Sequence, residues 1–242
     1  MRKPARWKKE AVTLTYVLGD VHGRADRFRA MLDRIRFTGQ DTLYLLGDMI
    51  DRNPDGIELL QQVRKTENMQ MILGNHEHMM LQALAEPTRP LFGRNEKRDL
   101  WYYNGGEVTH RAFRSLEKTE QKELLDWLAD LPLNLELNCA GRDWLLVHGS
   151  PAASFPTRGH AYPDETSYAV WERLDPFTEN DFPELTILCG HTPTVYFRAA
   201  NPMEIVRNGN VICLDCGCAF PQRVGGRLAC LCLETDEVFY TD

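Results

Sequence analysis

The chain has 242 residues, of which 43% are hydrophobic, and this is enough for the core of one large domain or two small ones. Its formal net charge of -7 and its pI near 5.6 give no general attraction to nucleic acid or to anionic membranes. The basic segment 1–9 is not followed by an apolar stretch long enough for a signal peptide or a membrane span. We therefore expect a cytoplasmic protein that binds neither nucleic acid nor membranes, with residues 1–10 as a flexible basic arm.

Strand-like and helix-like segments alternate through the first 84 residues. Apolar runs predict strands at 12–18, where β-branched residues are included, and at 43–46 and 69–73. Between and after them, apolar residues at helical spacing predict helices at 24–36, at 54–65 and in the segment that ends at residue 84. This order implies parallel strands that are joined by right-handed crossovers.

The second half of the chain is rich in strands. Residues 87–97 are expected to form a loop, 101–106 the end of a helix, and 118–131 a helix that packs on the core. Short apolar runs predict strands at 133–137, 143–147, 185–189, 211–214, 228–233 and 238–240. Because no Gly/Ser-rich linker separates the halves, we predict an α/β fold in which residues 11–242 form a single domain of two packed sheets flanked by helices.

The seven cysteines are an odd number for a disulfide framework, so reduced thiols are expected. Cys213, Cys216 and Cys218 have a spacing that zinc sites use. However, Cys213 lies in a strand-like apolar run, and no fourth ligand follows at a matching spacing. A thiolate zinc site is therefore the less favoured interpretation.

Five of the predicted strands end in polar residues beside a glycine, in the segments 19–23, 47–52, 74–77, 147–149 and 190–192. A single Gly-Asp pair usually marks only a strand that is followed by a turn, but five such ends in one chain point to a shared site. Asp48 follows Asp20 by 28 residues and Asn75 follows Asp48 by 27, so each interval is one strand–helix unit and the three side chains should meet at one sheet edge. The candidate ligands are Asp20, His22, Asp48, Asn75, His148 and His191.

This set of ligands contains oxygen and imidazole nitrogen and no thiolate, which suits Mn²⁺, Fe or Zn²⁺. Six ligands exceed what one ion with an open position needs, but they fit two ions that share a bridging carboxylate. Two-metal sites of this kind hydrolyse phosphate esters. The residues alone therefore predict metal-dependent phosphoester chemistry.

The five motifs GDxHG, GDxxDR, GNHE, HG and GHT resemble those of the calcineurin-like metallophosphoesterases. The chain looks most similar to the PPP-type serine/threonine protein phosphatases of bacteria and phage lambda, which segments 101–106, 170–173 and 214–217 also resemble. The resemblance implies a two-sheet β-sandwich core flanked by helices. It also implies a phosphomonoesterase that dephosphorylates phosphoserine and phosphothreonine proteins by direct attack of a hydroxide bridging two metal ions.

The resemblance further implies a role for each matching residue. Asp20, His22 and Asp48 would hold the first metal ion, and Asp48 would bridge to a second ion. The second ion would be held by Asp48, Asn75, His148 and His191. Manganese is the first choice for both ions, with iron or zinc as alternatives. His76 would be the general acid, oriented by Asp51, while Arg52, Arg173 and Asn75 would bind the substrate phosphate.

Several residues have a simpler interpretation beside the functional one. His22 and His148 could be turn histidines, and Arg173 could be a surface arginine on a helix. Asp215 is as well explained by a turn as by a role in orienting the site. Cys216, which stands where the resembling proteins usually have threonine, raised the hypothesis of oxidative inhibition.

The principal alternative function is a symmetrical bis(5'-nucleosyl)-tetraphosphatase or another small phosphoester hydrolase. Asp51, Arg52 and Glu77 favour the protein phosphatase pattern, with a phosphorylated protein or peptide as the expected substrate. Separately, a monomer is expected. A phosphodiesterase is less favoured for so acidic a chain. A catalytically inactive scaffold is the alternative from a different class. Segments 87–97 and 150–167 are the candidates for substrate selection.

Overall fold

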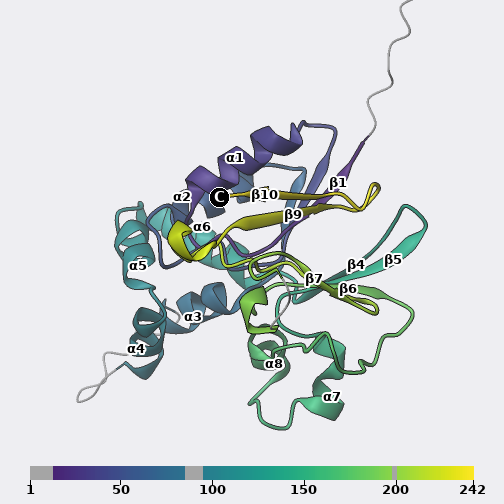
Figure 1. The fold of residues 1–242 in the computed structure, drawn as a ribbon. Coiled ribbons are helices and arrows are strands. Elements are labelled where there is room, and N and C mark those ends of the chain that lie inside the picture. Colours follow the sequence, from purple (N-terminus) through teal and green to yellow (C-terminus); the bar gives the residue numbers. More distant parts are fainter. Residues whose placement is uncertain (1–12, 85–94, 198–200) are drawn as a thin grey trace, which may run out of the picture.

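Two five-stranded sheets pack face to face in the part of the chain that the structure describes (Figure 1). The structure is a computed structural model and describes residues 13–84, 95–197 and 201–242. The expected basic arm and most of the expected loop at 87–97 lie outside the described residues. The predicted α/β fold with two packed sheets and flanking helices is confirmed.

The first sheet has the order β10-β9-β1-β2-β3, and its centre is the predicted parallel unit. β9 pairs with β1 in antiparallel orientation, so the last two strands of the chain complete the sheet that the first half begins. The division of the sequence into an α/β half and a β-rich half is therefore not the division between the sheets. The strands are β1 Thr15–Leu18, β2 Thr42–Leu45, β3 Met69–Met71, β9 Leu228–Cys232 and β10 Val238–Thr241.

The second sheet has the order β4-β5-β6-β8-β7. β5, β6 and β8 run parallel, whereas β4 and β7 pair at the two edges in antiparallel orientation. The sequence did not predict β7, which has only 3 residues and a single buried side chain. The strands are β4 Asn134–Cys139, β5 Arg142–Val147, β6 Thr186–Cys189, β7 Val206–Asn208 and β8 Val211–Cys213.

Helices cover the outer face of the first sheet and the ends of both sheets (Figure 1). They are α1 Ala25–Ile35, α2 Gly56–Lys65, α3 Asn75–Leu84, α4 Glu96–Tyr103, α5 Glu107–Arg114, α6 Lys118–Ala129, α7 Phe155–Arg158 and α8 Glu165–Trp171. Short 3₁₀ turns are η1 Ala152–Ser154, η2 Thr194–Phe197 and η3 Gln222–Val224. The prediction that the loop extends to residue 97 was wrong, because α4 already begins at Glu96. The side chain of Asn95 caps the start of this helix. The sequence did not predict α5 or α7.

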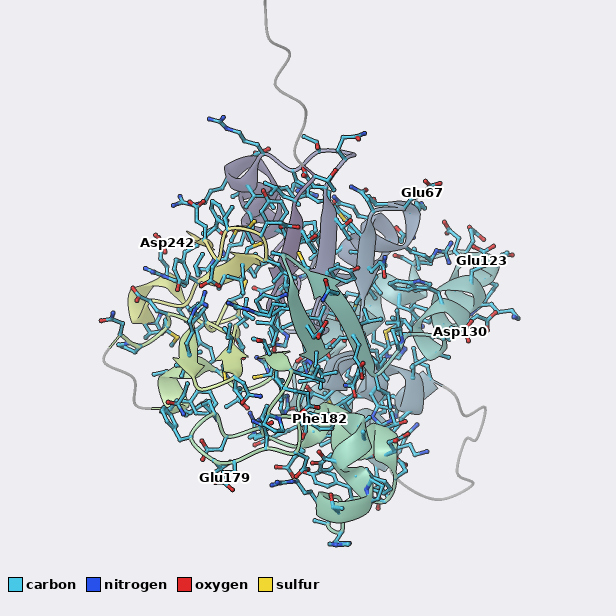
Figure 2. All side chains as sticks on the ribbon, turned by 90° about the vertical axis from the view of Figure 1, so that its right-hand side faces the viewer. Glu67, Glu123, Asp130, Glu179, Phe182 and Asp242 are labelled. Atoms are coloured by element: carbon cyan, nitrogen blue, oxygen red, sulfur yellow. The ribbon has the colours of Figure 1, made fainter. Side chains whose placement is uncertain are left out.

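Successive side chains of a strand point to opposite faces of the sheet, and this explains why the first sheet has helices on one face and the second sheet on the other. Leu18 packs with the helices on one face of the first sheet, whereas its neighbour Val17 points to the opposite face. There Val17 joins Leu146 and Leu188 of the second sheet in a core between the sheets. Side chains fill this space, and charged residues such as Glu123 lie at the periphery (Figure 2). In the described residues no helix is long and apolar enough to cross a membrane.

Candidate active site

The structure brings the polar strand ends of both sheets together. Asp20 and Asp48 follow β1 and β2, and Asn75 is the first residue of the helix after β3. His148 directly follows β5, and His191 follows β6 in the second sheet. All six predicted ligands, His22 included, are at most 7% exposed. Because parallel strands end at a common edge, residues up to 171 positions apart in the chain become neighbours here.

Two groups of possible metal ligands share Asp48. One consists of Asp48, His22 and His76, and the other of Asp48, His148 and His191. Asp48 Oδ2 lies 3.7 Å from His22 Nε2, and Asp48 Oδ1 lies 3.4 Å from His148 Nε2. The two oxygens of one carboxylate therefore face different groups, as a bridging ligand requires.

Hydrogen bonds on the far side of each imidazole fix where its proton lies. A carbonyl or carboxylate oxygen only accepts, so the ring nitrogen that faces it carries the hydrogen and the other nitrogen presents a lone pair. This lone pair faces the Asp48 carboxylate or Asn75 in the four histidines of the site, His22, His76, His148 and His191. The pairs are His22 Nδ1 to Ile50 O at 3.0 Å, His148 Nδ1 to Leu46 O at 2.6 Å, His191 Nε2 to Trp171 O at 3.1 Å and His76 Nδ1 to Asp51 Oδ2 at 2.6 Å.

The surroundings of Asn75 test whether these residues fit a cation. Asn75 Oδ1 lies 2.9 Å from His148 Nε2 and 3.0 Å from His191 Nδ1, so one oxygen faces two lone pairs. Burial lowers the pKa of His148 to about 4, and a proton therefore does not relieve this repulsion near neutral pH. A cation among the three acceptors does relieve it, so this donor set fits a divalent metal ion.

The first group contains two candidates for its third ligand. Asp20 Oδ2 lies 3.9 Å from His22 Nε2, while His76 Nε2 lies 3.8 Å from Asp48 Oδ2. His76 Nε2 is also 3.1 Å from Arg52 Nη2, and a cation bound there would face a guanidinium. Asp20 is therefore the better ligand, and His76 is left for another role.

Concentrated negative charge accompanies the histidines. Burial, followed by the nearby Asp215, raises the pKa of Asp20 well above its usual value. Burial and then Glu77 do the same to the pKa of Asp48. Asp215 is only 3% exposed, and its Oδ1 accepts a hydrogen bond from Gly217 N, so it both forms a turn and lies beside the ligands. Divalent cations would offset this repulsion and return the carboxylates to their ionised form.

The turn after β2 contains Asp51, which was predicted to orient the general acid His76, and Arg52, which was predicted to bind phosphate. Asp51 Oδ2 accepts a hydrogen bond from His76 Nδ1–H, and burial raises the pKa of Asp51 to about 7. Burial and then Arg52 lower the pKa of His76 well below its usual value. A bound phosphate anion beside the ring would shift that pKa upward, toward the protonated form that an acid needs.

Arg173 lies at the site, but not on a helix as the sequence interpretation had it. α8 ends at Trp171, and Glu172 is already extended. From this position Arg173 Nη1 donates to His191 O at 3.2 Å and to Thr192 Oγ1 at 3.0 Å. These contacts place its guanidinium beside His191, and its charge contributes to the lowered pKa of His148 and His191.

Left-handed backbone is concentrated at these residues. Gly47 has φ 95°, and a Cβ on it would lie only 2.6 Å from Gly74 Cα. Non-glycine residues rarely adopt positive φ and do so at a cost of about 1–3 kcal/mol each, which the surrounding contacts must offset. At the site they are His22 at 50°, Asp48 at 50°, Asp51 at 71°, Arg52 at 68° and His191 at 64°.

Sequence reasoning did not assign roles to three buried residues that hold this turn. Glu77 accepts hydrogen bonds from the backbone N–H groups of residues 48, 49 and 50. Thr109 Oγ1 accepts from Asp51 N at 2.9 Å, and Trp101 Nε1 donates to Asp51 Oδ2 at 2.9 Å. Glu77 and Trp101 do lie in segments that the sequence singled out, but nothing in the sequence pairs them with the turn.

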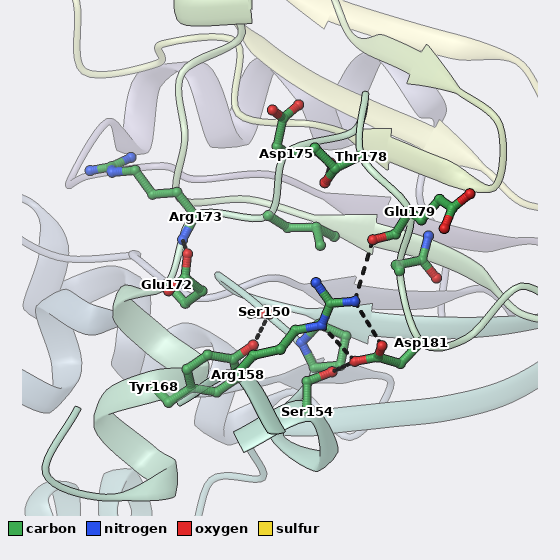
Figure 3. A pocket seen from close by; sticks show the side chains of 13 residues that line it. Ser150, Ser154, Arg158, Tyr168, Glu172, Arg173, Asp175, Thr178, Glu179 and Asp181 are labelled. Atoms are coloured by element: carbon green, nitrogen blue, oxygen red, sulfur yellow. Dashed lines mark hydrogen bonds and ion pairs between the residues drawn. The ribbon is translucent and has the colours of Figure 1, made fainter. Parts of the chain in front are cut away.

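A pocket of about 450 Å³ lies next to Arg173, between segments 150–158 and 172–181 (Figure 3). Part of the predicted rim at 150–167 therefore does line a cavity. Arg158 makes a two-pronged ion pair with Asp181, and the Arg173 guanidinium points away from this pair (Figure 3). The further carboxylates of Glu172, Asp175 and Glu179 make the pocket better suited to hydrogen-bond donors than to a second phosphate.

The Cys216 thiol does not have the surroundings of a reactive cysteine. It is 1% exposed, and burial followed by Asp215 raises its pKa well above the usual value. Because the thiolate is the form that oxidants attack, these surroundings argue against the hypothesis of oxidative inhibition.

Comparison with known proteins agrees with this site. Residues 14–212 match the model of the family described as calcineurin-like phosphoesterase. The symmetrical bis(5'-nucleosyl)-tetraphosphatase of Cronobacter sakazakii is 37% identical over 121 residues, which are 49% of this chain and 37% of that relative. The protein of the same name from Escherichia coli K12 is 35% identical over 121 residues, 49% of this chain and 38% of that relative. The match therefore covers well under two thirds of the relatives' length.

The solved structures agree in fold. The crystal structure of a candidate diadenosine tetraphosphatase has a TM-score of 0.63 at 17% identity, covering 96% of this chain and 94% of that one. The narrower expectation of a PPP-type protein phosphatase is not confirmed, since the relatives carry the name of the alternative function. The match to the family model extends over most of the chain, and the protein belongs to the calcineurin-like phosphoesterase family.

Proposed function

We propose that this phosphoesterase depends on two divalent metal ions, and that a dinucleoside tetraphosphate, cleaved symmetrically, is its first candidate substrate. The sharing of Asp48 between two groups of ligands is the observation that carries the two-metal chemistry. The names of the relatives support the nucleotide substrate. This reverses the order of preference that the sequence motifs alone gave.

The residues of the chain have distinct tasks in this proposal. Asp20, His22, Asp48, Asn75, His148 and His191 would hold the ions, with manganese as our first choice. When bound, the two cations would supply neutralisation of phosphate charge and activation of water. Arg52 and Arg173 would bind phosphate oxygens through their planar donor groups. His76 would donate the proton at Nε2 to the leaving oxygen while Asp51 holds Nδ1.

The pocket beside Arg173 would receive the part of the substrate beyond the reacting phosphate. Its carboxylates can accept hydrogen bonds from ribose hydroxyls and from the amino group of a base. The same groups would also suit a basic side chain of a peptide. The pocket therefore accommodates either substrate class, and the reacting phosphate need not enter it.

A phosphoserine or phosphothreonine protein is the second candidate, and the His76–Asp51 pair favours it. A serine alkoxide is a poor leaving group that needs a proton, which a histidine held 2.6 Å from a carboxylate can supply. A nucleoside diphosphate leaves as a stabilised anion and gains less from the acid. Monomeric state and a cytoplasmic location remain expectations from the sequence.

One assay panel separates these functions. Protein loaded with Mn²⁺ is given diadenosine tetraphosphate, phosphoserine, phosphothreonine and phosphotyrosine peptides, and p-nitrophenyl phosphate. We expect turnover of the dinucleotide to two molecules of ADP. Hydrolysis of the phosphoserine and phosphothreonine peptides without the dinucleotide would select the second candidate, and turnover of none of the substrates would indicate an inactive scaffold.

A His76→Asn variant tests whether His76 acts as the general acid. It should retain metal binding, because His76 is not among the assigned ligands, and should lose on the order of 10²-fold or more in kcat on the alkyl phosphates. Unchanged turnover in this variant would remove His76 from the mechanism.

A further inference from the structure

The segment of α4 and α5 lies against the turn that carries Asp51 and Arg52. Trp101 Nε1 donates to Asp51 Oδ2 at 2.9 Å, and the Asp51 N–H donates to Thr109 Oγ1 at 2.9 Å. The Arg52 N–H donates to Gly105 O at 3.1 Å. Three contacts from one helical hairpin therefore hold two adjacent residues, although the residues that make these contacts lie at least 50 positions away in the sequence.

These contacts explain why the turn keeps an unfavourable backbone. Asp51 and Arg52 are consecutive non-glycine residues in the left-handed region, with φ 71° and 68°. Gly105, itself at φ 95°, approaches so closely that a Cβ on it would lie 3.0 Å from Arg52 Cγ. The hairpin thus determines the conformation of the turn from outside it.

The Asp51 carboxylate is anchored through a single oxygen. Oδ2 receives both the indole N–H of Trp101 and the Nδ1–H of His76, the latter at 2.6 Å. Oδ1 is buried and has no hydrogen-bond partner among the described residues. If the indole N–H were removed, the carboxylate would keep His76 and the Thr109 side chain but would lose one of the two hydrogen bonds at Oδ2. It would then be freer to rotate about its own bond and to take the imidazole with it.

Trp101 itself is firmly fixed. Its side chain is 0% exposed and belongs to the hydrophobic core, and its ring centroid lies 5.4 Å from that of His110. A large rigid side chain with one donor at its edge is well suited to fix the position of another group. The chain of contacts Trp101–Asp51–His76 therefore leads from the core to the reacting side of the imidazole.

We propose that Trp101 is a positioning residue for proton donation, because its indole N–H fixes the Asp51 carboxylate and thereby the direction in which His76 Nε2 points. The proposal rests on the proposed function, in which His76 protonates the leaving group. In that step water adds its oxygen to phosphorus and releases one proton to solvent, the bond from phosphorus to the leaving oxygen breaks, and the proton of His76 passes to that oxygen. His76 then takes up a proton from solvent. The products of an aryl phosphate are the phenol and inorganic phosphate.

The test is Trp101→Phe, which removes the N–H and keeps an aromatic side chain. Mn²⁺-loaded wild type and variant are compared on phenyl phosphate and p-nitrophenyl phosphate, whose leaving groups differ strongly in basicity. The kcat on phenyl phosphate should fall on the order of tenfold, as expected for a lost hydrogen bond to a charged group. The kcat on p-nitrophenyl phosphate should fall about twofold or less, because that leaving group needs little protonation. KM should be unchanged for both.

Two controls separate positioning from a general loss of structure. Trp127→Phe alters a partly buried tryptophan of α6 and should leave both rates unchanged. In a His76→Asn background, Trp101→Phe should cause no further loss on phenyl phosphate, since the two residues act as a unit. Should Trp101→Phe fail to fold by circular dichroism, Thr109→Val is measured in its place and must show the same dependence on the leaving group.

Equal losses on the two substrates, or additive losses in the double variant, would overturn the positioning role while leaving the phosphoesterase in place. Inactivity of the wild type on both aryl phosphates together with turnover of diadenosine tetraphosphate would overturn the positioning role alone. Inactivity on all three substrates would overturn the proposed function as well. A selective loss on phenyl phosphate that disappears without His76 supports the proposal.

Discussion

Replacing Glu77 by alanine should destabilise the protein far more than a single side chain usually does. Glu77 is 0% exposed and directs both carboxylate oxygens at the backbone after β2. Oε2 accepts from Asp48 N at 2.9 Å, and Oε1 accepts from Met49 N at 2.9 Å and from Ile50 N at 3.3 Å. These N–H groups belong to the turn beyond the sheet, so Glu77 supplies the acceptors that a neighbouring strand would otherwise provide.

The size of the effect follows from these three donors. A buried donor that loses its partner costs about 1–3 kcal/mol, so the two short bonds and one long bond together account for about 3–6 kcal/mol. Part of this is offset, because burial raises the pKa of Glu77 to about 7 and the carboxylate is itself costly to bury. A loss of about 3–4 kcal/mol remains, out of a total stability of about 5–15 kcal/mol for a typical domain.

Urea unfolding in EDTA, followed by circular dichroism, measures this loss. Glu77→Gln should lie between wild type and alanine, because an amide oxygen can still serve two donors while the amide nitrogen faces the third. Glu58→Ala is the matched control, since that carboxylate on α2 is 58% exposed in a surface ion pair with Arg29 and should contribute about 0–1 kcal/mol. If Glu77→Ala were no less stable than Glu58→Ala, the reasoning from the buried N–H groups would be refuted.

Two further predictions concern metal and pH. Asp48→Asn should weaken both ion sites and His191→Ala chiefly one of them, as measured by calorimetric titration with Mn²⁺; two intact sites in Asp48→Asn would contradict the shared ligand. Burial raises the pKa of Asp51 and Glu77 to about 7 and that of Asp215 to about 6, so each of them binds a proton more tightly in the folded protein than in the unfolded chain. The pKa values of Asp20 and Asp48 are raised as well, whereas the histidines with lowered pKa values act in the opposite direction below about pH 7 and are neutral in both the folded and the unfolded state above it. The free energy of unfolding in EDTA should therefore fall as the pH rises from about 7 to about 8. Mn²⁺ should raise the Tm more at the upper end of this range, and a Tm in EDTA that rises with pH would count against these assignments.

The main elements of the fold could be predicted because local signals agree with the tertiary structure. The periods of the apolar residues place β1, β2 and β3 and the helices between them, and short crossovers leave only a parallel arrangement. The pairing of β9 with β1 could not be predicted, because two apolar strands with some 200 residues between them carry no mark of partnership. The short β7 and the helix α5 lack a pattern strong enough to identify them.

The candidate ligands could be predicted because the geometry of parallel strands brings the residues at their ends together. Asp20, Asp48 and Asn75 each stand one strand–helix unit apart, and such a spacing brings them to the same edge of the sheet. What the sequence could not decide is the substrate. The motifs favoured a protein phosphatase, whereas the relatives carry the name of a dinucleotide hydrolase. One type of metal site can serve both activities, and the segments around it then select the substrate.

The sequence by itself therefore determined the ligands and the type of chemistry, since both depend on residue types at strand ends. Only the tertiary structure decided how the turn at Asp48–Arg52 is held. Glu77, Thr109 and Trp101 reach it from α3, α5 and α4, and each does so through one or a few hydrogen bonds. Such contacts depend on the direction of a single N–H or oxygen in a packed core, and no periodicity or spacing in the sequence encodes that direction.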